Sequence, residues 1–117
     1  MSTLEIEIQE ARAQDVRVDE NVLAVDLTDG RTIITPLTWY PRLVYGTVKE
    51  RANFEIIGDG RYIHWPDLDE DLTVAGILAG HPSHESQTSL KKWLDARQKL
   101  VRQQVRQVAE KKPKYGK

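Results

Sequence analysis

Two groups of polar side chains in this 117-residue sequence have the residue types and spacing that chemistry requires. His64 and Asp67 stand three residues apart and could act as an acid–base pair, which would predict a small hydrolase. Asp67, Asp69 and Asp71 have the 1, 3, 5 spacing of the first oxygen ligands in a calcium-binding loop. Both groups fall within residues 64–71, so a catalytic or metal site would be expected there first.

Neither group is completed by the residues around it. In the calcium loop, Leu72 takes the place of the glycine at the sharp turn, and Leu78 that of the bidentate glutamate. Beside His64 and Asp67, no motif places a serine, cysteine or lysine nucleophile. We therefore expect no catalytic residue and no calcium site. The acidic run is interpreted as favouring the dipole of a helix that follows it.

A third group, His81 and His84, forms a His-x-x-His pair. Histidine is a zinc ligand, but the chain has no cysteine and no third ligand lies close in sequence. Residues 81–85 are therefore interpreted as a polar connector, and we expect no metal and no cofactor. His64 shares one face of an alternating segment with Tyr62, so we expect it to be a hydrogen-bonded histidine of a sheet.

Two aromatic segments could serve binding instead of catalysis. They are Trp39-Tyr40-Pro41-Arg42 and His64-Trp65-Pro66-Asp67, each at the expected end of a strand. Trp, Tyr and Arg dominate many protein interfaces, but Trp and Tyr also bury large areas in cores. One interpretation is a shared core lid beneath short helices, and the other is a contact patch for a protein partner. The candidates for partner contact are Trp39, Tyr40, Arg42, His64, Trp65 and Asp67.

Charge is divided unevenly along the chain. Residues 1–90 hold 16 acidic and 7 basic side chains, and residues 91–117 hold 2 acidic and 10 basic ones, so a net charge of −1 conceals −9 and +8. The basic segment predicts a solvated helix face, contact with nucleic-acid phosphates, or docking on an acidic protein surface. The candidate residues are Lys91, Lys92, Arg97, Lys99, Arg102 and Arg106.

The elements that must position these residues begin with the period of a strand. Residues 15–19, 22–27 and 31–37 predict a three-stranded antiparallel meander, because tight turns separate them and Asp29-Gly30 is a strong hairpin signal. Residues 1–13 alternate only weakly, and we expect a frayed edge strand or a disordered arm there.

A hairpin follows from residues 54–57 and 61–65, which bring the sheet to about five strands. Between the meander and the hairpin, Pro41 fits the first turn of a short helix that Gly46 would end in a left-handed conformation. The segment from Thr47 to Glu50 has the form of a capping box, which predicts a second short helix over residues 48–52.

Two further helices are predicted after the hairpin. One covers residues 74–79, with Asp71 or Thr73 as its N-cap and Gly80 as its closing residue. The other is long, begins near Ser86 and is amphipathic. Its apolar positions include Leu90, Trp93, Leu94, Leu100, Val101, Val105 and Val108.

The long helix is a poor self-sufficient coiled coil. Leu94, Val101 and Val108 repeat at heptad spacing, but Arg97 and Gln104 interrupt the companion seam. Pro113 is expected to end the helix, and residues 114–117 to form a loose tail.

The composition also excludes several classes of protein. Without cysteine, the chain has no disulfide, no thiolate zinc site and no cysteine nucleophile. The longest apolar run without a charge, residues 72–80, is far shorter than the roughly 20 residues of a membrane-spanning helix. Residues 1–10 lack the apolar core of a signal peptide. We expect a cytoplasmic protein with no membrane partner.

Four segments carry a distinctive combination of residues. They are Asp26-Leu27-Thr28-Asp29-Gly30-Arg31-Thr32, Pro36-Leu37-Thr38-Trp39-Tyr40-Pro41-Arg42-Leu43, Glu50-Arg51-Ala52-Asn53, and Gly60 with Ile63-His64-Trp65-Pro66-Asp67-Leu68-Asp69-Glu70-Asp71-Leu72. Together they resemble the bacterial family DUF2442 over about residues 14–80. The similarity extends to residues 86–97, where a Ser/Gln-rich start precedes a Leu-x-x-Trp-Leu segment.

The resemblance implies a small α+β domain whose function is unassigned. Members resemble partners in toxin–antitoxin-like pairs, and some carry a helical DNA-binding extension at the C-terminus. Residues 99–117 are too short for a helix-turn-helix, so DNA binding carries over poorly.

We therefore predict an α+β fold: a mainly antiparallel sheet of about five strands, short helices, and a long C-terminal amphipathic helix. Residues 1–85 would form the α+β domain and residues 86–117 the basic helix and tail. The predicted function is a non-enzymatic protein-interaction module, an antitoxin-like or regulatory partner of a small bacterial protein. A homodimer through the C-terminal helix is one form of this, and nucleic-acid binding through the basic helix is the alternative.

Overall fold

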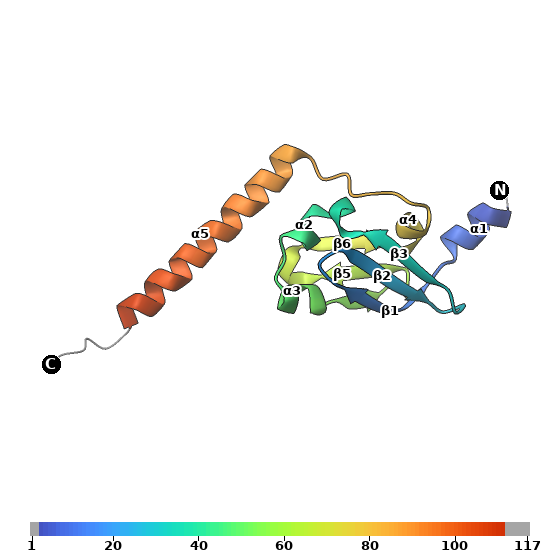
Figure 1. Cartoon of the computed structure of the whole chain (residues 1–117), viewed down its shortest axis with the longest axis horizontal. Helices are drawn as coiled ribbons and strands as arrows, with labels where there is room; N and C mark the ends of the chain where they lie inside the picture. Colours follow the sequence, from blue (N-terminus) through green and yellow to red (C-terminus); the bar gives the residue numbers. More distant parts are fainter. Residues whose placement is uncertain (1–2, 112–117) are drawn as a thin grey trace. The chain divides into compact units, whose positions relative to one another are not determined.

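A computed structural model describes residues 3–111 of the chain, with side chains as far as residue 108. The chain divides into two compact units, Met1–His84 and Glu85–Lys117 (Figure 1). Unit 1 contains both β-sheets and all of the short helices, and unit 2 contains one long helix. Each unit is described separately below.

The predicted meander is confirmed as the first sheet, sheet A. Its strands β1 (Ala13–Val18), β2 (Val22–Leu27) and β3 (Thr32–Pro36) are antiparallel in the order β1-β2-β3. At the turn between β2 and β3, Gly30 has a φ of 96°, a conformation that glycine adopts without a steric penalty. The Asp-Gly signal therefore marked this turn for a sound physical reason.

The remaining strands form a separate sheet, sheet B, which corrects the prediction of one sheet with about five strands. Its strands β4 (Glu55–Ile57), β5 (Tyr62–Trp65) and β6 (Glu70–Thr73) are antiparallel in the order β4-β5-β6, so the described chain has six strands in two sheets. Strand β6 was missed because acidic residues occupy two of its four positions, and such residues are depleted in strands.

The N-terminal segment is helical, so the prediction of an edge strand or a disordered arm was wrong for its described residues. Helix α1 covers Thr3–Gln9. Leu4 and Ile8 are four residues apart, so the same apolar residues that alternate weakly as a strand also share one side of a helix. No residue of α1 is buried.

Two short helices, α2 (Pro41–Val44) and α3 (Val48–Ala52), follow a 3₁₀ turn at Leu37–Trp39, as the proline and the capping box predicted. In the capping box, the Thr47 hydroxyl accepts from the Glu50 N–H at 3.1 Å, and the Glu50 carboxylate accepts from the Thr47 N–H at 2.9 Å.

The role predicted for Gly46 was wrong, because this residue is not left-handed. A Cβ atom at Gly46 would lie 2.9 Å from Cδ1 of the buried Leu68, so glycine is required there by close packing.

A second 3₁₀ turn, Pro66–Leu68, leads into β6, and helix α4 (Val74–Leu78) follows directly. Of the two N-caps considered, the structure selects Thr73, whose hydroxyl accepts from the Gly76 N–H at 3.0 Å. Gly80 is left-handed with a φ of 81°, which confirms it as the closing residue of α4.

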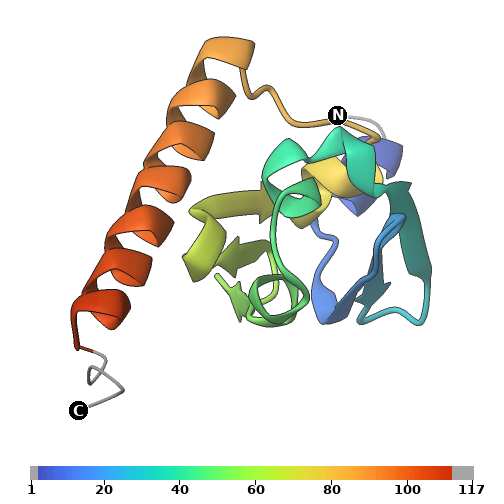
Figure 2. The same ribbon diagram turned by 60° about the vertical axis from the view of Figure 1, so that its left-hand side comes forward.

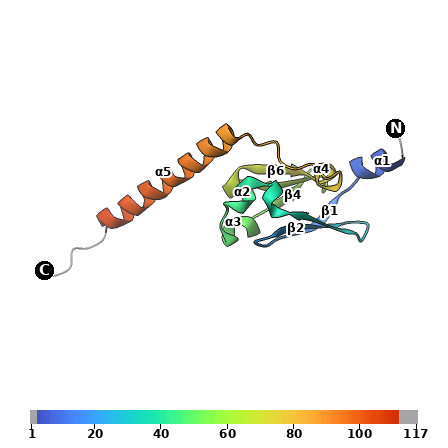
Figure 3. The same ribbon diagram turned by 45° about the horizontal axis from the view of Figure 1, so that its top comes forward.

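The core of unit 1 lies between the two sheets, which appear as separate layers in Figures 2 and 3. Strand alternation sends one face of each sheet inward. The largest fully buried side chains are Trp65, Tyr40, Leu23, Leu37, Leu43, Ile63, Leu68, Val25 and Val74. They come from β2, β5, the two 3₁₀ turns, α2, α4 and the link at Tyr40 between the first 3₁₀ turn and α2, so the core depends on the connections as much as on the sheets.

Unit 2 contains helix α5 (Gln87–Lys111), which confirms the predicted long helix. Ser86 is its N-cap, since the Ser86 Oγ accepts from the Ser89 N–H at 3.0 Å. The expected end at Pro113 and the tail over residues 114–117 lie outside the described residues. Within the described part of the chain, no helix is both long and apolar enough to cross a membrane.

Candidate interaction surfaces

The aromatic candidates divide by burial. Trp65 and Tyr40 are 0% and 1% exposed, so neither side chain offers surface to a partner. The Trp65 indole N–H donates to the Arg51 carbonyl at 3.1 Å, which satisfies its one polar atom inside the core. Trp39 is half-buried, and its carbonyl accepts from the Ser83 N–H at 2.9 Å. These aromatic segments hold unit 1 together.

Two polar candidates beside them also make contacts within unit 1. The Arg42 guanidinium donates to the Asp69 carbonyl at 2.9 Å, and it lies 3.5 Å from the Asp69 carboxylate. Asp69 is left-handed with a φ of 48°, so Arg42 holds a strained turn in place. Asp67 accepts from the Asn53 amide at 2.9 Å.

Sequence reasoning missed Arg51, whose role is the most extensive in this region. Its Nε donates to the Leu43 carbonyl at 2.8 Å and its Nη2 to the Val44 carbonyl at 2.7 Å. Arg51 therefore satisfies the Val44 carbonyl at the C-terminal end of α2 and adds a second donor to the Leu43 carbonyl, which also accepts from the Gly46 N–H at 3.2 Å. The Glu-Arg-Ala-Asn segment is distinctive in the sequence only through its resemblance to the family. The signal that could have found Arg51 is its place in α3, the helix that directly follows α2.

Tyr40 is the one buried tyrosine in the described core. Burial raises the pKa of its phenol, the neighbouring Thr35 hydroxyl partly opposes that rise, and the charge of Glu70 adds to it. Thr35 and Tyr40 are close, but their two hydroxyls do not complete a well-formed hydrogen bond.

Tyr40 should make the protein less stable at alkaline pH. In the unfolded chain the phenol ionises near pH 10, whereas the folded pKa is higher, so the protonated form stabilises the fold fully below about pH 10. This contribution is lost as the pH rises through the folded pKa. Urea unfolding followed by circular dichroism between about pH 8 and 11 measures the fall. Tyr40→Phe should flatten it, and Tyr45→Phe, at an exposed tyrosine, should not. Equal slopes in wild type and Tyr40→Phe would contradict this account.

His64 pairs with Asp71 and not with Asp67, so it is a hydrogen-bonded histidine of the sheet, as expected. The His64 Nδ1 lies 2.5 Å from the Asp71 Oδ1. The reason is the strand register, because β5 and β6 are antiparallel and place His64 directly opposite Asp71. The predicted face is confirmed: Tyr62 and His64 point outward, while Ile63 on the same strand is buried.

The outward side of sheet B forms a surface, which we call the sheet B face. It has two cross-strand rows, Glu55–His64–Asp71 and Ile57–Tyr62–Thr73. Ile57 and Tyr62 are 44% and 46% exposed, which is high for apolar side chains in a sheet.

The metal candidates do not converge. Among the described residues, no three His, Cys, Asp or Glu side chains form a group that could hold a metal ion. Asp67 and Asp71 contact Asn53 and His64 respectively, and His81 and His84 are exposed in the connector after α4.

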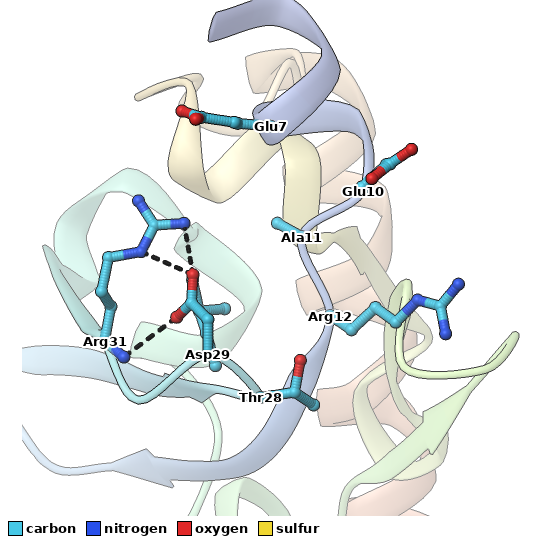
Figure 4. A pocket seen from close by; sticks show the side chains of 8 residues that line it. Glu7, Glu10, Ala11, Arg12, Thr28, Asp29 and Arg31 are labelled. Carbon is cyan, nitrogen blue, oxygen red and sulfur yellow. Dashed lines mark hydrogen bonds and ion pairs between the residues drawn. The ribbon is translucent and has the colours of Figure 1, made fainter. Parts of the chain in front are cut away.

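A polar pocket of about 380 Å³ lies between α1 and the turn that joins β2 to β3 (Figure 4). Its lining residues are Glu7, Glu10, Ala11, Arg12, Leu27, Thr28, Asp29 and Arg31. Asp29 and Arg31 face each other across the turn, with the Arg31 Nε 2.8 Å from the Asp29 carboxylate. Arg12 pairs with Asp59 at 2.8 Å. Both arginines thus already have acidic partners.

A second hollow, of about 310 Å³, lies at one end of the sheet B face. It is lined by Gln9, Ala11, Arg61, Tyr62, Thr73 and Ala75. Tyr62 and Thr73 belong to the sheet B face, so this face ends in a depression.

Helix α5 carries the largest exposed apolar stretch in unit 2. With successive residues rotated by about 100°, Leu94, Val101, Val105 and Val108 lie within an arc of about 60°. We call these four residues the α5 stripe. Its three valines are 56%, 63% and 60% exposed, and the adjacent Leu100 is 58% exposed.

The basic candidates of α5 separate into two positions. Five of them fall in an arc of about 100° beside the stripe, which we call the basic arc: Lys91, Lys92, Lys99, Arg102 and Arg106. All five are exposed. Arg97 lies elsewhere, with its guanidinium 4.7 Å from the centre of the Trp93 ring, a cation–π contact.

Comparisons with known proteins show a family and a fold. Residues 13–83 match the family described as "Protein of unknown function (DUF2442)", so α5 lies beyond the matched part. The chain is similar to a crystal structure of a protein of unknown function from Rhodospirillum rubrum, with 30% identity, a TM-score of 0.57, and coverage of 69% of this chain and 98% of that one.

It is also similar to the solution structure of an uncharacterized protein from Chromobacterium violaceum, with 19% identity, a TM-score of 0.55, and coverage of 74% of this chain and 80% of that one. At that identity the likeness concerns the fold alone. No curated protein matches the chain.

Proposed function

Because the chain belongs to the DUF2442 family of proteins of unknown function, as its motifs led us to expect, we propose its function from its own surfaces. The proposal is a non-enzymatic protein-interaction module in which α5 binds a groove on an acidic protein partner. An antitoxin-like or regulatory role in the cytoplasm is the form of this function that the resemblance favours.

The observation that carries the proposal is the exposure of the α5 stripe. Val101, Val105 and Val108 are each more than half exposed, on one side of one helix. Contiguous exposed apolar side chains mark interaction sites, and an amphipathic helix with anchors at i, i+4 and i+7 fits the helix-in-groove mode of recognition. Covering the stripe would remove this apolar area from water.

The basic arc supports an acidic partner. Among the described residues of α5 whose side chains are placed, Asp95 is the one acidic residue, and it lies within the basic arc among five cations. Opposite charges around an apolar contact orient the partners and speed their association. The polar groups of Arg42, Asp67 and Arg51 hold turns and helix ends within unit 1, so their role is structural.

Nucleic-acid binding through the basic arc is the alternative function. Five cations along one side of a helix could contact successive phosphates, and such binding weakens steeply with salt. It would not need the α5 stripe, which is what separates the two proposals.

The double variant Val101→Asp/Val105→Asp should abolish partner binding. Introducing two carboxylates into the stripe removes its apolar contact and repels an acidic partner, so we expect at least a 100-fold rise in Kd for the partner recovered by crosslinking and then purified. Gln103→Asp/Gln107→Asp makes the same change of charge on the opposite side of α5 and should alter Kd less than about threefold.

Binding to a 20-base-pair duplex, measured with the same variants against salt, tests the alternative. Nucleic-acid binding predicts tight duplex binding whose salt slope falls by about 2 in Arg102→Gln/Arg106→Gln. It also predicts that an uncharged stripe variant, such as Val101→Ser/Val105→Ser, leaves duplex binding unchanged. These results together would overturn the protein proposal.

A further inference from the structure

The sheet B face has the chemistry of a surface that receives a basic amphipathic helix. Its outward positions include Glu55 and Asp71 but no lysine or arginine, while Glu70 lies on the inner side, opposite the buried Trp65. Next to the row of Glu55, His64 and Asp71 lies the partly exposed apolar pair Ile57 and Tyr62. The face therefore sets an acidic row beside an apolar row.

The dimensions of the face also suit a helix. Neighbouring strands are about 4.8 Å apart, so the outer strands β4 and β6 are separated by roughly 10 Å, close to the diameter of an α-helix. The hollow of about 310 Å³ beside Tyr62 and Thr73 gives one end of this face a depression for an apolar side chain. Arg61 also lines this hollow.

We propose that the sheet B face binds α5 of a second copy of this chain, so that two copies exchange their helices and form a closed dimer. This inference rests on the proposed function, because it uses the same α5 stripe and names one partner for it. Val101 and Val105 would cover Ile57 and Tyr62, and the basic arc would lie along the row of Glu55 and Asp71.

Charge complementarity selects a second copy as the occupant. Residues 1–90 carry −9 and residues 91–117 carry +8, so the helix of one chain is attracted to the α+β unit of another. Pairing of α5 with α5 would instead bring two +8 segments together. Arg97 and Gln104 would also interrupt the seam of such a coiled coil. A reciprocal exchange is self-complementary and closes with two-fold symmetry.

Sedimentation equilibrium of the full chain tests the proposal. The wild type should be a dimer in the micromolar range and dissociate as salt is raised. An arm variant, Val101→Asp/Val105→Asp, and a face variant, Ile57→Lys/Tyr62→Lys, should each raise the dimer Kd at least 100-fold. Ile34→Lys is the matched control for Ile57→Lys, because it places one lysine at an exposed isoleucine of sheet A, and it should leave the dimer intact. Far-UV circular dichroism checks that each variant is folded. If the double face variant is unfolded, the single variant Ile57→Lys is used in its place.

Mixing the arm and face variants gives the sharpest result. One has an intact face and the other an intact α5, so an equimolar mixture should form a heterodimer through one of the two contacts. If the mixture formed no heterodimer, the exchange of helices would be overturned. If the arm variant dissociated while the face variant stayed a dimer, the result would favour pairing of α5 with α5 instead. A wild-type chain that is monomeric at 500 µM would also overturn the dimer. The proposed function would still hold in that case if a foreign protein partner bound through the α5 stripe.

Discussion

Replacing Trp65 by alanine should lower the free energy of unfolding by about 3–5 kcal/mol. The side chain is completely buried, and its removal leaves a cavity between β5 and the short helices. It also leaves the Arg51 carbonyl without the indole N–H that now donates to it at 3.1 Å. A loss of this size approaches the whole stability of many small domains, so Trp65→Ala should be largely unfolded at 37 °C.

Urea unfolding of Trp65→Ala and Trp65→Phe, followed by circular dichroism, measures this effect. Phenylalanine keeps most of the apolar volume and loses the hydrogen bond, so its loss should be clearly smaller than that of alanine. Trp93→Ala is the matched control, because Trp93 lies in unit 2 and its loss should leave the unfolding midpoint of unit 1 unchanged. A cooperative transition of Trp65→Ala within about 1 kcal/mol of wild type would contradict the core role of Trp65.

Replacing Arg51 by methionine should lower the free energy of unfolding by about 2 kcal/mol. Two carbonyls at the end of α2, those of Leu43 and Val44, would lose a charged donor, and hydrogen bonds to charged groups are worth about 1.5–3 kcal/mol. Methionine preserves much of the length and packing of the side chain, so the loss reports mainly on the hydrogen bonds.

Lys49→Met on the same helix is the control for Arg51→Met. Lys49 is exposed, and its replacement should change stability by less than about 0.5 kcal/mol. Hydrogen exchange adds a local readout, since the amides of α2 should lose protection in Arg51→Met before those of β2 do. Equal stability of the two variants would show that Arg51 does not support α2.

Local signals in the sequence were sufficient for most elements. The Asp-Gly turn, the Thr47 capping box and the apolar spacing of α5 each involve residues within a few positions of one another, so their physics can be read from the sequence. Strand β6 could not be, because its acidic residues become part of a strand only when β5 is present to pair with them. The same holds for α1, whose alternation fits either a strand or a helix.

The candidate sites depended more on long-range structure. Tyr40 and Trp39 are neighbours of similar chemistry, yet one is buried and the other is half-exposed, and residue type does not distinguish them. The partner of His64 is set by strand register, which brings Asp71 opposite although Asp67 is closer in sequence. Gly46 shows the same limit, because the neighbour that requires a glycine, Leu68, is 22 positions away.

The N-cap of α5 has a consequence for protein engineering. The Ser86 Oγ accepts from the Ser89 N–H, and the Ser86 carbonyl accepts from the Leu90 N–H at 2.9 Å. Both hydrogen bonds that start α5 are therefore made within residues 86–90. The family match ends at residue 83, just before this cap. The segment from residue 85 onward therefore includes the N-cap of its own helix. It could be fused to another protein, or replaced by another helix, without loss of that cap.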